Sequence, residues 1–498
     1  MTPTSEQAAA VDLFQEGNSL AIEAGAGTGK TSTLTLIGQA DQGRRGQYVA
    51  FNKAIATEAG ARMPGNVTAS TAHSLAYRSV MSGNRDLAAR LRSPRMRSQE
   101  IARILGIDPL VVSYGSERKP LAPAFLAGLT MRAVTRFCQS ADREVAGSHV
   151  PYVEGIDLPT SDGRRTYANN AVLRRHLAGA LRKAWADLSS PRGRLPYKHE
   201  HYLKTWHLSG PVINAEFILF DEAQDANPVL VDIVAQQAHA QLVWVGDSQQ
   251  SIYEWTGAIN ALATVPSDQR TFLTQSFRFG SEVASVANGL LDRLGADLRL
   301  RGSDQVASVV GPCDDPDVVL TRTNAEGVRR LFDAVDEGLR VALIGGAADV
   351  AAFVRAAQQL QTTGFTAHPE LACFTSWGEV QEYVFADSQG DELRRLVDLV
   401  DEYGPDRILG ALDRMPPERD ADLVVSTAHK AKGREWPSVQ LAGDFVPPKD
   451  GGELPPEELR LLYVACTRAK RELDVTAVPH ALAVPEPAAP TVPPLAVH

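Results

Sequence analysis

Short apolar runs recur along the chain and are separated by stretches with helical spacing. We predict that these runs are buried strands, at residues 19–22, 48–51, 67–71, 217–220, 242–245, 318–320, 341–344, 423–426 and 438–442. Strands that alternate with helices are typical of parallel sheets with helices on both faces. Thr4 and Gln7 form a capping-box signature, which predicts a first helix through Phe14.

Two mostly helical stretches interrupt this alternation and suggest a division into two cores. The predicted boundaries are 1–80 and 209–275 for core 1, 81–208 for a helical insertion in core 1, 276–349 and 421–478 for core 2, and 350–420 for a short helical insertion in core 2. The last stretch, 479–498, is rich in Pro, Ala and Val, and we expect it to be a disordered tail.

The charge of the chain is distributed unevenly. The 498 residues carry a formal net charge of −10, whereas residues 81–210 hold 21 Lys and Arg against 11 Asp and Glu. A basic segment inside an acidic chain is typical of a nucleic-acid contact, although solvated helix faces would give the same count.

Several classes of protein are disfavoured by composition. No apolar run reaches the roughly 18 residues of a membrane span, and the N-terminus lacks the features of a secretory signal. The four cysteines, Cys138, Cys313, Cys373 and Cys466, are dispersed, which argues against a disulfide framework or a zinc site. We therefore expect a cytoplasmic protein, with a nucleoid-associated or phage-encoded one also possible, and no contact with membranes.

A glycine-rich segment between the first strand and a helix carries the clearest chemical signal. It consists of Ala24, Gly25, Ala26, Gly27, Thr28, Gly29, Lys30 and Thr31. Small residues let backbone N–H groups point at a polyphosphate, and the helix N-terminus adds its positive dipole end. Lys30 is expected to reach the β- and γ-phosphates of ATP and Thr31 to hold Mg²⁺. Ala24 replaces the first glycine of the usual pattern, which is tolerated if its φ stays negative.

A second signal lies at the end of the apolar run 217–220, where Asp221 and Glu222 follow directly. A carboxylate in this place is a ligand for Mg²⁺, and its neighbour can act as a general base toward water. We expect Asp221 to bind the metal together with Thr31, and Glu222 to activate the water. The two carboxylates are weak evidence for an ATP site when taken alone. They become strong evidence when they occur in the same chain as Lys30 and Thr31.

Three longer motifs are found farther along the chain: DEAQD at 221–225, GDSQQSIYEW at 246–255 and YVACTRA at 463–469. With these motifs the chain, from Gln7 to about Leu473, resembles superfamily 1 DNA helicases of the UvrD/Rep type. The motifs AFNKAIA at 50–56, TAHSLA at 71–76 and HYLKTW at 201–206 are most similar to the F-box helicase branch, in the motor region only. The resemblance implies a P-loop NTPase with two RecA-like parallel-sheet cores and helical insertions, and ATP in the cleft between the cores.

The resemblance also implies roles for residues around the nucleotide. By position, Gln7 matches a residue that reads adenine, Phe277 replaces a tyrosine that stacks on adenine, and Glu435 matches a ribose contact. Gln250 matches a sensor of the γ-phosphate. Arg278 and Arg468 match arginines that approach the γ-phosphate from core 2.

The same resemblance implies contacts with a single DNA strand, in which bases stack on aromatic rings without regard to sequence. Phe51, Tyr253 and Trp255 occupy positions of this kind, and Asn52 and His73 lie in strand-contacting motifs. The arginines that often flank the tryptophan are replaced here by Glu254 and Thr256.

These features predict an ATP-dependent DNA helicase or translocase that acts as a monomer on single strands and on junctions with duplex, with ATP and Mg²⁺. The resemblance implies travel from 3′ to 5′, which composition does not indicate. An alternative is a translocase that displaces bound proteins with little unwinding. A nucleic-acid-binding adaptor with a switching ATP site and an unrelated P-loop kinase fit the combined arginines and carboxylates less well.

Overall fold

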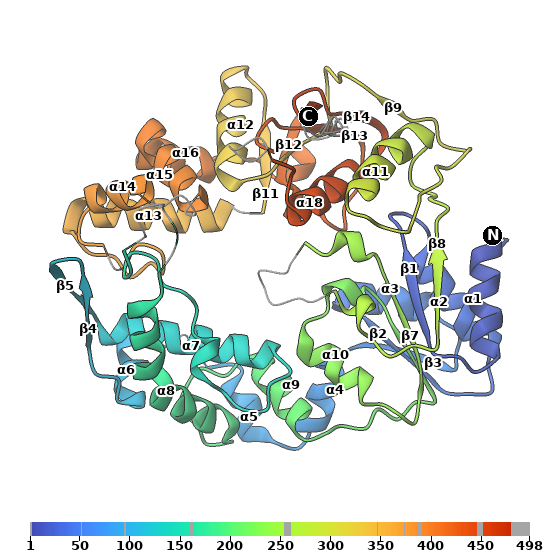
Figure 1. Cartoon of the computed structure of the whole chain (residues 1–498), viewed down its shortest axis with the longest axis horizontal. Helices are drawn as coiled ribbons and strands as arrows, with labels where there is room; N and C mark the ends of the chain where they lie inside the picture. Colours follow the sequence, from blue (N-terminus) through green and yellow to red (C-terminus); the bar gives the residue numbers. More distant parts are fainter. Residues whose placement is uncertain are drawn as a thin grey trace, which may run out of the picture.

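The structure is a computed structural model. It describes residues 2–50, 52–93, 96–158, 164, 166–252, 260–345, 347–372, 374–386, 391–445 and 452–479. Figure 1 shows two sheet-containing parts and two groups of helices that lie apart from the sheets. The predicted tail lies outside the described residues from position 480 onward.

The first sheet forms what we call core 1, and all of its strand pairs are parallel. In spatial order its strands are β3 (Val67–Thr71), β2 (Gly46–Ala50), β6 (Phe217–Phe220), β7 (Gln241–Gly246), β1 (Leu20–Ala24) and β8 (Gln269–Leu273). The helices around it are α1 (Ser5–Gln15), α2 (Lys30–Ala40), α3 (Lys53–Arg62), α4 (Ala72–Ala76) and α10 (Pro228–Ala235).

Successive side chains along the strands of core 1 point to opposite faces of the sheet. Leu20 and Ile22 of β1 pack with Phe14 of α1 and Leu34 of α2, whereas Ala21 belongs to the cluster on the other face. This period of two is the geometry of a strand that is buried on both sides. It explains why the runs were continuously apolar.

The second sheet forms core 2 and is also parallel. In spatial order its strands are β11 (Val341–Ile344), β12 (Leu423–Thr427), β10 (Val318–Thr321), β13 (Trp436–Leu441), β14 (Ala469–Asp474) and β9 (Val309–Val310). The helices around it are α11 (Ser281–Arg293), α12 (Asn324–Asp336), α17 (Ala428–Ala431) and α18 (Pro456–Cys466). The predicted fold class, two parallel-sheet cores of an α/β P-loop NTPase, is confirmed.

The N-terminal helical block comprises the helices between β3 and β6 that follow α4. They are α5 (Arg85–Arg90), α6 (Ser98–Leu105), α7 (Pro123–Gln139), α8 (Ala168–Ser189) and α9 (His199–Leu208). The sequence indicated only helices here, but β4 (Leu110–Tyr114) and β5 (Glu117–Leu121) form an antiparallel hairpin. Gly115 turns the hairpin with φ +62°, a conformation that glycine adopts without strain.

The C-terminal helical block lies between β11 and β12. It comprises α13 (Ala347–Thr363), α14 (Trp377–Ala386), α15 (Asp391–Tyr403) and α16 (Pro405–Asp413). Across the described residues, no helix combines the length and hydropathy that a membrane crossing requires.

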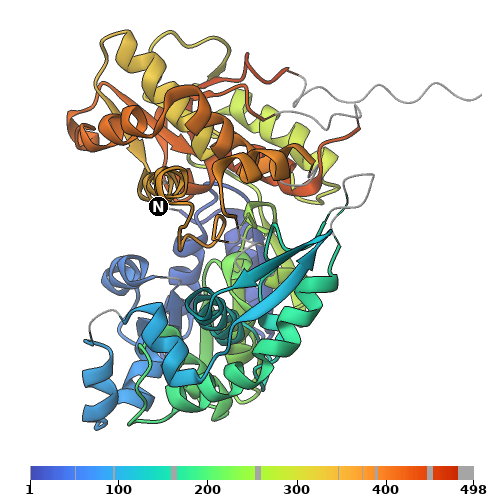
Figure 2. The same ribbon diagram turned by 90° about the vertical axis from the view of Figure 1, so that its left-hand side faces the viewer.

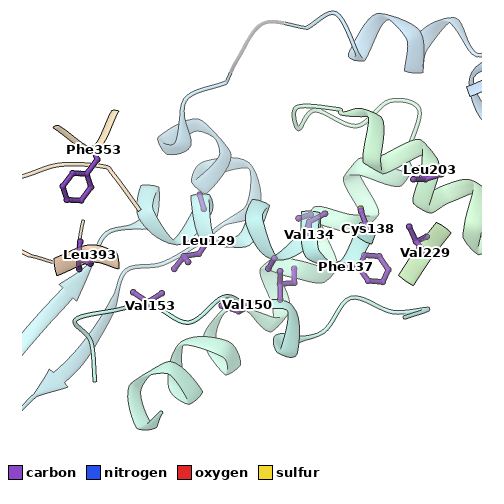
Figure 3. Close-up of a cluster of buried hydrophobic side chains, with 14 of the residues drawn as sticks. Leu129, Val134, Phe137, Cys138, Val150, Val153, Leu203, Val229, Phe353 and Leu393 are labelled. Atoms are coloured by element: carbon purple, nitrogen blue, oxygen red, sulfur yellow. The ribbon is translucent and has the colours of Figure 1, made fainter. Parts of the chain in front are cut away.

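The two helical blocks touch each other. Lys119 of β5 forms an ion pair with Glu379 of α14, and Tyr383 donates a hydrogen bond of 2.5 Å to Glu154. Figure 2 shows the hairpin β4–β5 with the helices of the C-terminal helical block above it. One apolar cluster runs from Val229 of α10 through α7 to Phe353 of α13 (Figure 3). The blocks are therefore joined by packing as well as by charge.

Candidate active site

The glycine-rich loop lies where the sequence placed it, between the end of β1 and the start of α2. Ala24 is the last residue of β1 and has a negative φ, so its methyl group is accommodated. Gly29 precedes α2 with φ +80° and provides no side-chain cap. The N–H groups of the first turn of α2 are thus presented by backbone alone, as an anion site requires.

Core 2 residues pack directly against this loop. A Cβ at Gly27, where φ is +75°, would lie 2.7 Å from Arg278 Cβ and from Ser276 Oγ. Ser276 Oγ donates to the Ala26 carbonyl at 2.9 Å, and the Phe277 N–H donates to the Gly27 carbonyl at 2.9 Å. Glycine at position 27 is required by both the backbone angle and the close approach.

Lys30 and Thr31 reach the carboxylates at the end of β6. Lys30 Nζ lies 2.8 Å from Glu222 Oε2, and Thr31 Oγ1 donates to Asp221 Oδ2 at 3.2 Å. The Tyr48 hydroxyl, from β2, donates to the same Asp221 oxygen at 2.5 Å. The four predicted residues are therefore together, and Tyr48 is a member that the sequence did not indicate.

Burial and charge set the pKa values in this cluster. Burial alone would lower the pKa of Lys30, but Glu222, Asp247 and Asp221 outweigh it and raise that pKa. Burial would raise the pKa of Glu222, yet the charge of Lys30 and the hydrogen bond from Gln224 lower it. For Asp221, burial and the neighbouring Glu222 raise the pKa. Lys30 and Glu222 form a charged pair beside a carboxylate that is harder to ionise.

Glu222 also has an unusual backbone. Its φ is +55°, and among the described residues it is the non-glycine residue with positive φ. A left-handed glutamate costs of order 1 kcal/mol and persists only where its surroundings fix it. Here Gln224 Nε2 donates to Glu222 Oε2 at 2.6 Å, so the carboxylate is held beside Lys30.

Two arginines from core 2 lie at the same seam. Arg278 Nε donates to Glu435 Oε2 at 2.8 Å, and its Nη1 donates to the Thr467 carbonyl at 3.0 Å. Arg468 is almost fully buried, and its Nη2 approaches Gln250 Oε1 of core 1 at 3.4 Å. Burial, followed by the charge of Arg278, lowers the pKa of Arg468 to about 9. Among the described residues no carboxylate forms an ion pair with Arg468, so this buried guanidinium is poised to meet an anion.

Two further core 2 residues bridge the seam and were not assigned roles from the sequence. The Tyr463 hydroxyl donates to Asp247 Oδ2 at 3.0 Å and accepts from the Ala26 N–H at 3.3 Å. Lys432 Nζ donates to Asp225 Oδ1 at 2.5 Å and also to the Gln250 carbonyl. Tyr463 lies inside the motif at 463–469 that carried the resemblance, which was the available signal for it, whereas Lys432 lies outside the motifs named above.

Gln7 and Phe277 flank the loop at Gly29. A Cβ at Gly29 would lie 3.3 Å from Gln7 Nε2 and 3.7 Å from Phe277 Cε2. Gln7 completes the predicted capping box with Thr4, and its Nε2 donates to Thr33 Oγ1 at 3.1 Å. The Phe277 ring is 43% exposed, which leaves a ring face for stacking. Glu435 forms ion pairs with Arg278 and Lys470.

Two of the five residues predicted to contact DNA, Asn52 and His73, lie within the described part of the chain. Asn52 caps α3 by accepting from the Ile55 N–H at 2.9 Å, and it lines the same cavity as His73 of α4. Phe51, Tyr253 and Trp255 lie outside the described residues.

The residues present fit a nucleotide and a magnesium ion. The first turn of α2 has no side-chain cap that would compete with a phosphate for its N–H groups, and Lys30 and the two arginines supply positive charge. Thr31 and Asp221 offer oxygen ligands 3.2 Å apart, the donor type that Mg²⁺ prefers together with substrate phosphates.

Comparison with known proteins agrees with this geometry. A family model described as an AAA domain matches residues 7–256, and one described as the UvrD-like helicase C-terminal domain matches residues 422–476. The F-box DNA helicase protein 1 of Schizosaccharomyces pombe is 31% identical over 512 residues, which cover 94% of this chain and 57% of that protein. The F-box DNA helicase 1 of Gallus gallus is 29% identical over 499 residues, which cover 92% of this chain and 47% of that protein.

A shorter match is found in a probable DNA helicase II homolog of Mycoplasma genitalium, 33% identical over 85 residues, which cover 15% of this chain and 12% of that protein. The chain spans about half the length of the F-box helicases that it matches. The first family model covers half of the chain, including the glycine-rich loop and the end of β6, and the second covers Lys432 and Arg468. The chain therefore belongs to the UvrD/Rep type of superfamily 1 P-loop NTPases.

Proposed function

We propose that the chain is an ATP-hydrolysing DNA helicase that moves along single-stranded DNA, from 3′ to 5′, and unwinds duplex at junctions. The observation that carries this proposal is the network across the seam. Lys30 pairs with Glu222 on core 1, while Arg468 of core 2 reaches Gln250 of core 1. The relatives named as DNA helicases support DNA as the substrate, and the direction rests on the resemblance.

The proposed chemistry is attack of water on the γ-phosphorus of ATP. A new bond forms from the water oxygen to phosphorus, the bond to the bridging oxygen of ADP breaks, and Glu222 accepts the water proton. Lys30, Arg278 and Arg468 would neutralise the charge that develops on the phosphate oxygens. Magnesium held by Thr31 and Asp221 would withdraw charge from the same oxygens.

The Lys30–Glu222 pair suggests how the base becomes active only with substrate. ATP phosphates would compete with Glu222 for the Lys30 ammonium. Since the charge of Lys30 lowers the pKa of Glu222, transfer of Lys30 to phosphate raises that pKa toward the range of an effective base. Glu222 would thus gain basicity when the phosphate arrives.

Arg278 would exchange partners in the same way. Its bond to Glu435 lies at the rim of the seam, and a γ-phosphate would draw the guanidinium inward. Loss of that phosphate would release it. Closure and opening of the two cores around each ATP would then move the DNA-contacting residues relative to each other, with Gln250 as the link to the DNA-facing motif.

The test is strand displacement from duplexes that carry a 3′ or a 5′ single-stranded overhang, with ATP. We expect unwinding of the 3′-tailed substrate, and no unwinding by Lys30→Ala. Lys183→Ala, which changes an exposed lysine of α8, is the matched control and should unwind normally. Displacement of a protein bound to single-stranded DNA, without unwinding, would instead support the stripping translocase. ATP hydrolysis that is insensitive to DNA would contradict both.

A further inference from the structure

The cavity introduced above lies between core 1 and the N-terminal helical block. It measures about 810 Å³, and its walls come from α3, β3, α4 and α9. Asn52 and His73 line it, and so do Tyr77 and His199, which the sequence did not associate with DNA. Figure 1 shows α4 and α9 next to each other, and contacts between them confirm the view.

Four rings form an ordered aromatic cluster in this wall. Tyr202 of α9 is 3% exposed and packs edge to face with Tyr77, His73 and His199, at centroid distances of 5.7, 6.1 and 5.7 Å. His199 Nδ1 also lies 3.1 Å from the Tyr202 hydroxyl. A buried ring with three partners fixes the orientation of the more exposed rings.

Like His199, Tyr77 is an exposed member of the cluster. It is 42% exposed, whereas a tyrosine that only filled a core would be covered. It begins a π-helical turn, Tyr77–Met81, that directly continues α4. Such turns are rare and occur often at functional sites. The backbone irregularity and the exposed ring coincide at one residue.

The rest of the cavity wall favours a nucleic-acid strand. Lys53 and Arg78 provide positive charge, and Ser70, Thr71 and Ser74 provide hydroxyl groups. Among the described residues that line the cavity, none is acidic. Basic and hydroxyl side chains bind the phosphates and sugars of a strand, and an aromatic ring accepts an unpaired base.

We propose that Tyr77 and His199 form a base-stacking site for single-stranded DNA, which extends the strand path from Asn52 and His73 onto α9. This inference rests on the proposed function, because it takes DNA as the ligand of the same protein. The N-terminal helical block thereby contributes directly to strand binding through α9. Single-stranded DNA is the specific requirement, since a base inside a duplex is stacked on both faces and leaves none free for Tyr77.

The proposal is tested by the affinity of the full chain for a fluorescent oligothymidine, measured by anisotropy without nucleotide. Tyr77→Ala should weaken binding about fivefold or more, because a stacked base contributes at least about that much. Tyr77→Phe should bind as the parent protein does, because the ring is kept. Tyr167→Ala, which removes an exposed tyrosine of the same helical block outside this cavity, should also leave affinity unchanged.

Melting temperatures of the variants report whether they fold. Parent-like binding by folded Tyr77→Ala, or equal losses in Tyr77→Ala and Tyr77→Phe, would overturn the stacking site. If either outcome is found while DNA still accelerates ATP hydrolysis by the parent protein, the proposed function stands and this inference alone fails. Absence of any DNA stimulation in the parent protein would instead defeat the proposed function.

Discussion

Lys432 and Asp225 form the charge pair by which core 2 holds the Asp221–Asp225 motif of core 1. Their side chains are 9% and 6% exposed, and Lys432 Nζ lies 2.5 Å from Asp225 Oδ1. Removal of one partner from a buried pair costs about 3–5 kcal/mol, since the other charge is left uncompensated. Gln224 Nε2 still lies 3.3 Å from the second Asp225 oxygen. We therefore expect Lys432→Met to cost about 3 kcal/mol, at the lower end of that range.

The loss should depend on pH. Burial already raises the pKa of Asp225 in spite of Lys432, and removal of Lys432 raises it further. A folded state that holds this proton more tightly than the unfolded chain loses stability as pH rises. Lys432→Met should therefore be less destabilising at pH 5.5 than at pH 8.

The assay is calorimetric unfolding of the parent protein, both single variants and the double variant. A loss of about 3 kcal/mol lowers the melting temperature by roughly 6–12 °C for a unit of core size. Asp225→Asn together with Lys432→Met should recover most of that loss, because no unpaired charge remains. Arg434→Met, which breaks an ion pair with Glu418 that is 42% and 45% exposed, should shift melting little. Additive losses in the double variant would refute the reasoning.

Three further substitutions test the glycine-rich loop, the proposed general base and a buried histidine. Gly27→Ala should abolish ATP turnover in a phosphate-release assay, because its Cβ would collide with core 2 at 2.7 Å; Gly65→Ala, at a glycine with open space around it, should not. Glu222→Gln should slow turnover about 10²- to 10⁴-fold as expected for a lost general base, while affinity for a fluorescent ATP analogue stays within a few-fold; equal losses would contradict that role. Burial lowers the pKa of His201 to about 3. Below about pH 6.5 the imidazole therefore binds a proton in the unfolded chain but not in the folded protein. The free energy of unfolding falls as the pH drops from about 6.5 toward 3. His201→Gln keeps the capping position and should reduce that acid sensitivity in melting curves, unless another group is responsible.

Local sequence was sufficient for strands that are buried on both faces. The apolar runs at β6 and β7 were predicted because each residue of these strands is covered. Strands β8 and β14 were not indicated, because exposed positions mix polar residues into them. The hairpin β4–β5 was missed for the same reason, since most of its side chains are not buried. A strand with one face in water has no continuous apolar run, because polar residues occupy the solvent-facing positions.

The sequence by itself determined the proposed ATP site, because the loop from Ala24 to Thr31 and the carboxylates after β6 are contiguous motifs whose backbone positions follow from strand and helix ends. Only the tertiary structure decided which groups meet across the seam. The Tyr463 hydroxyl accepts a hydrogen bond from a backbone N–H more than four hundred positions away. The Tyr202 ring packs against His73 of α4 and His199 of α9. Such contacts depend on how whole elements pack, and local patterns of hydrophobic and polar residues carry no information about which distant side chains will become neighbours.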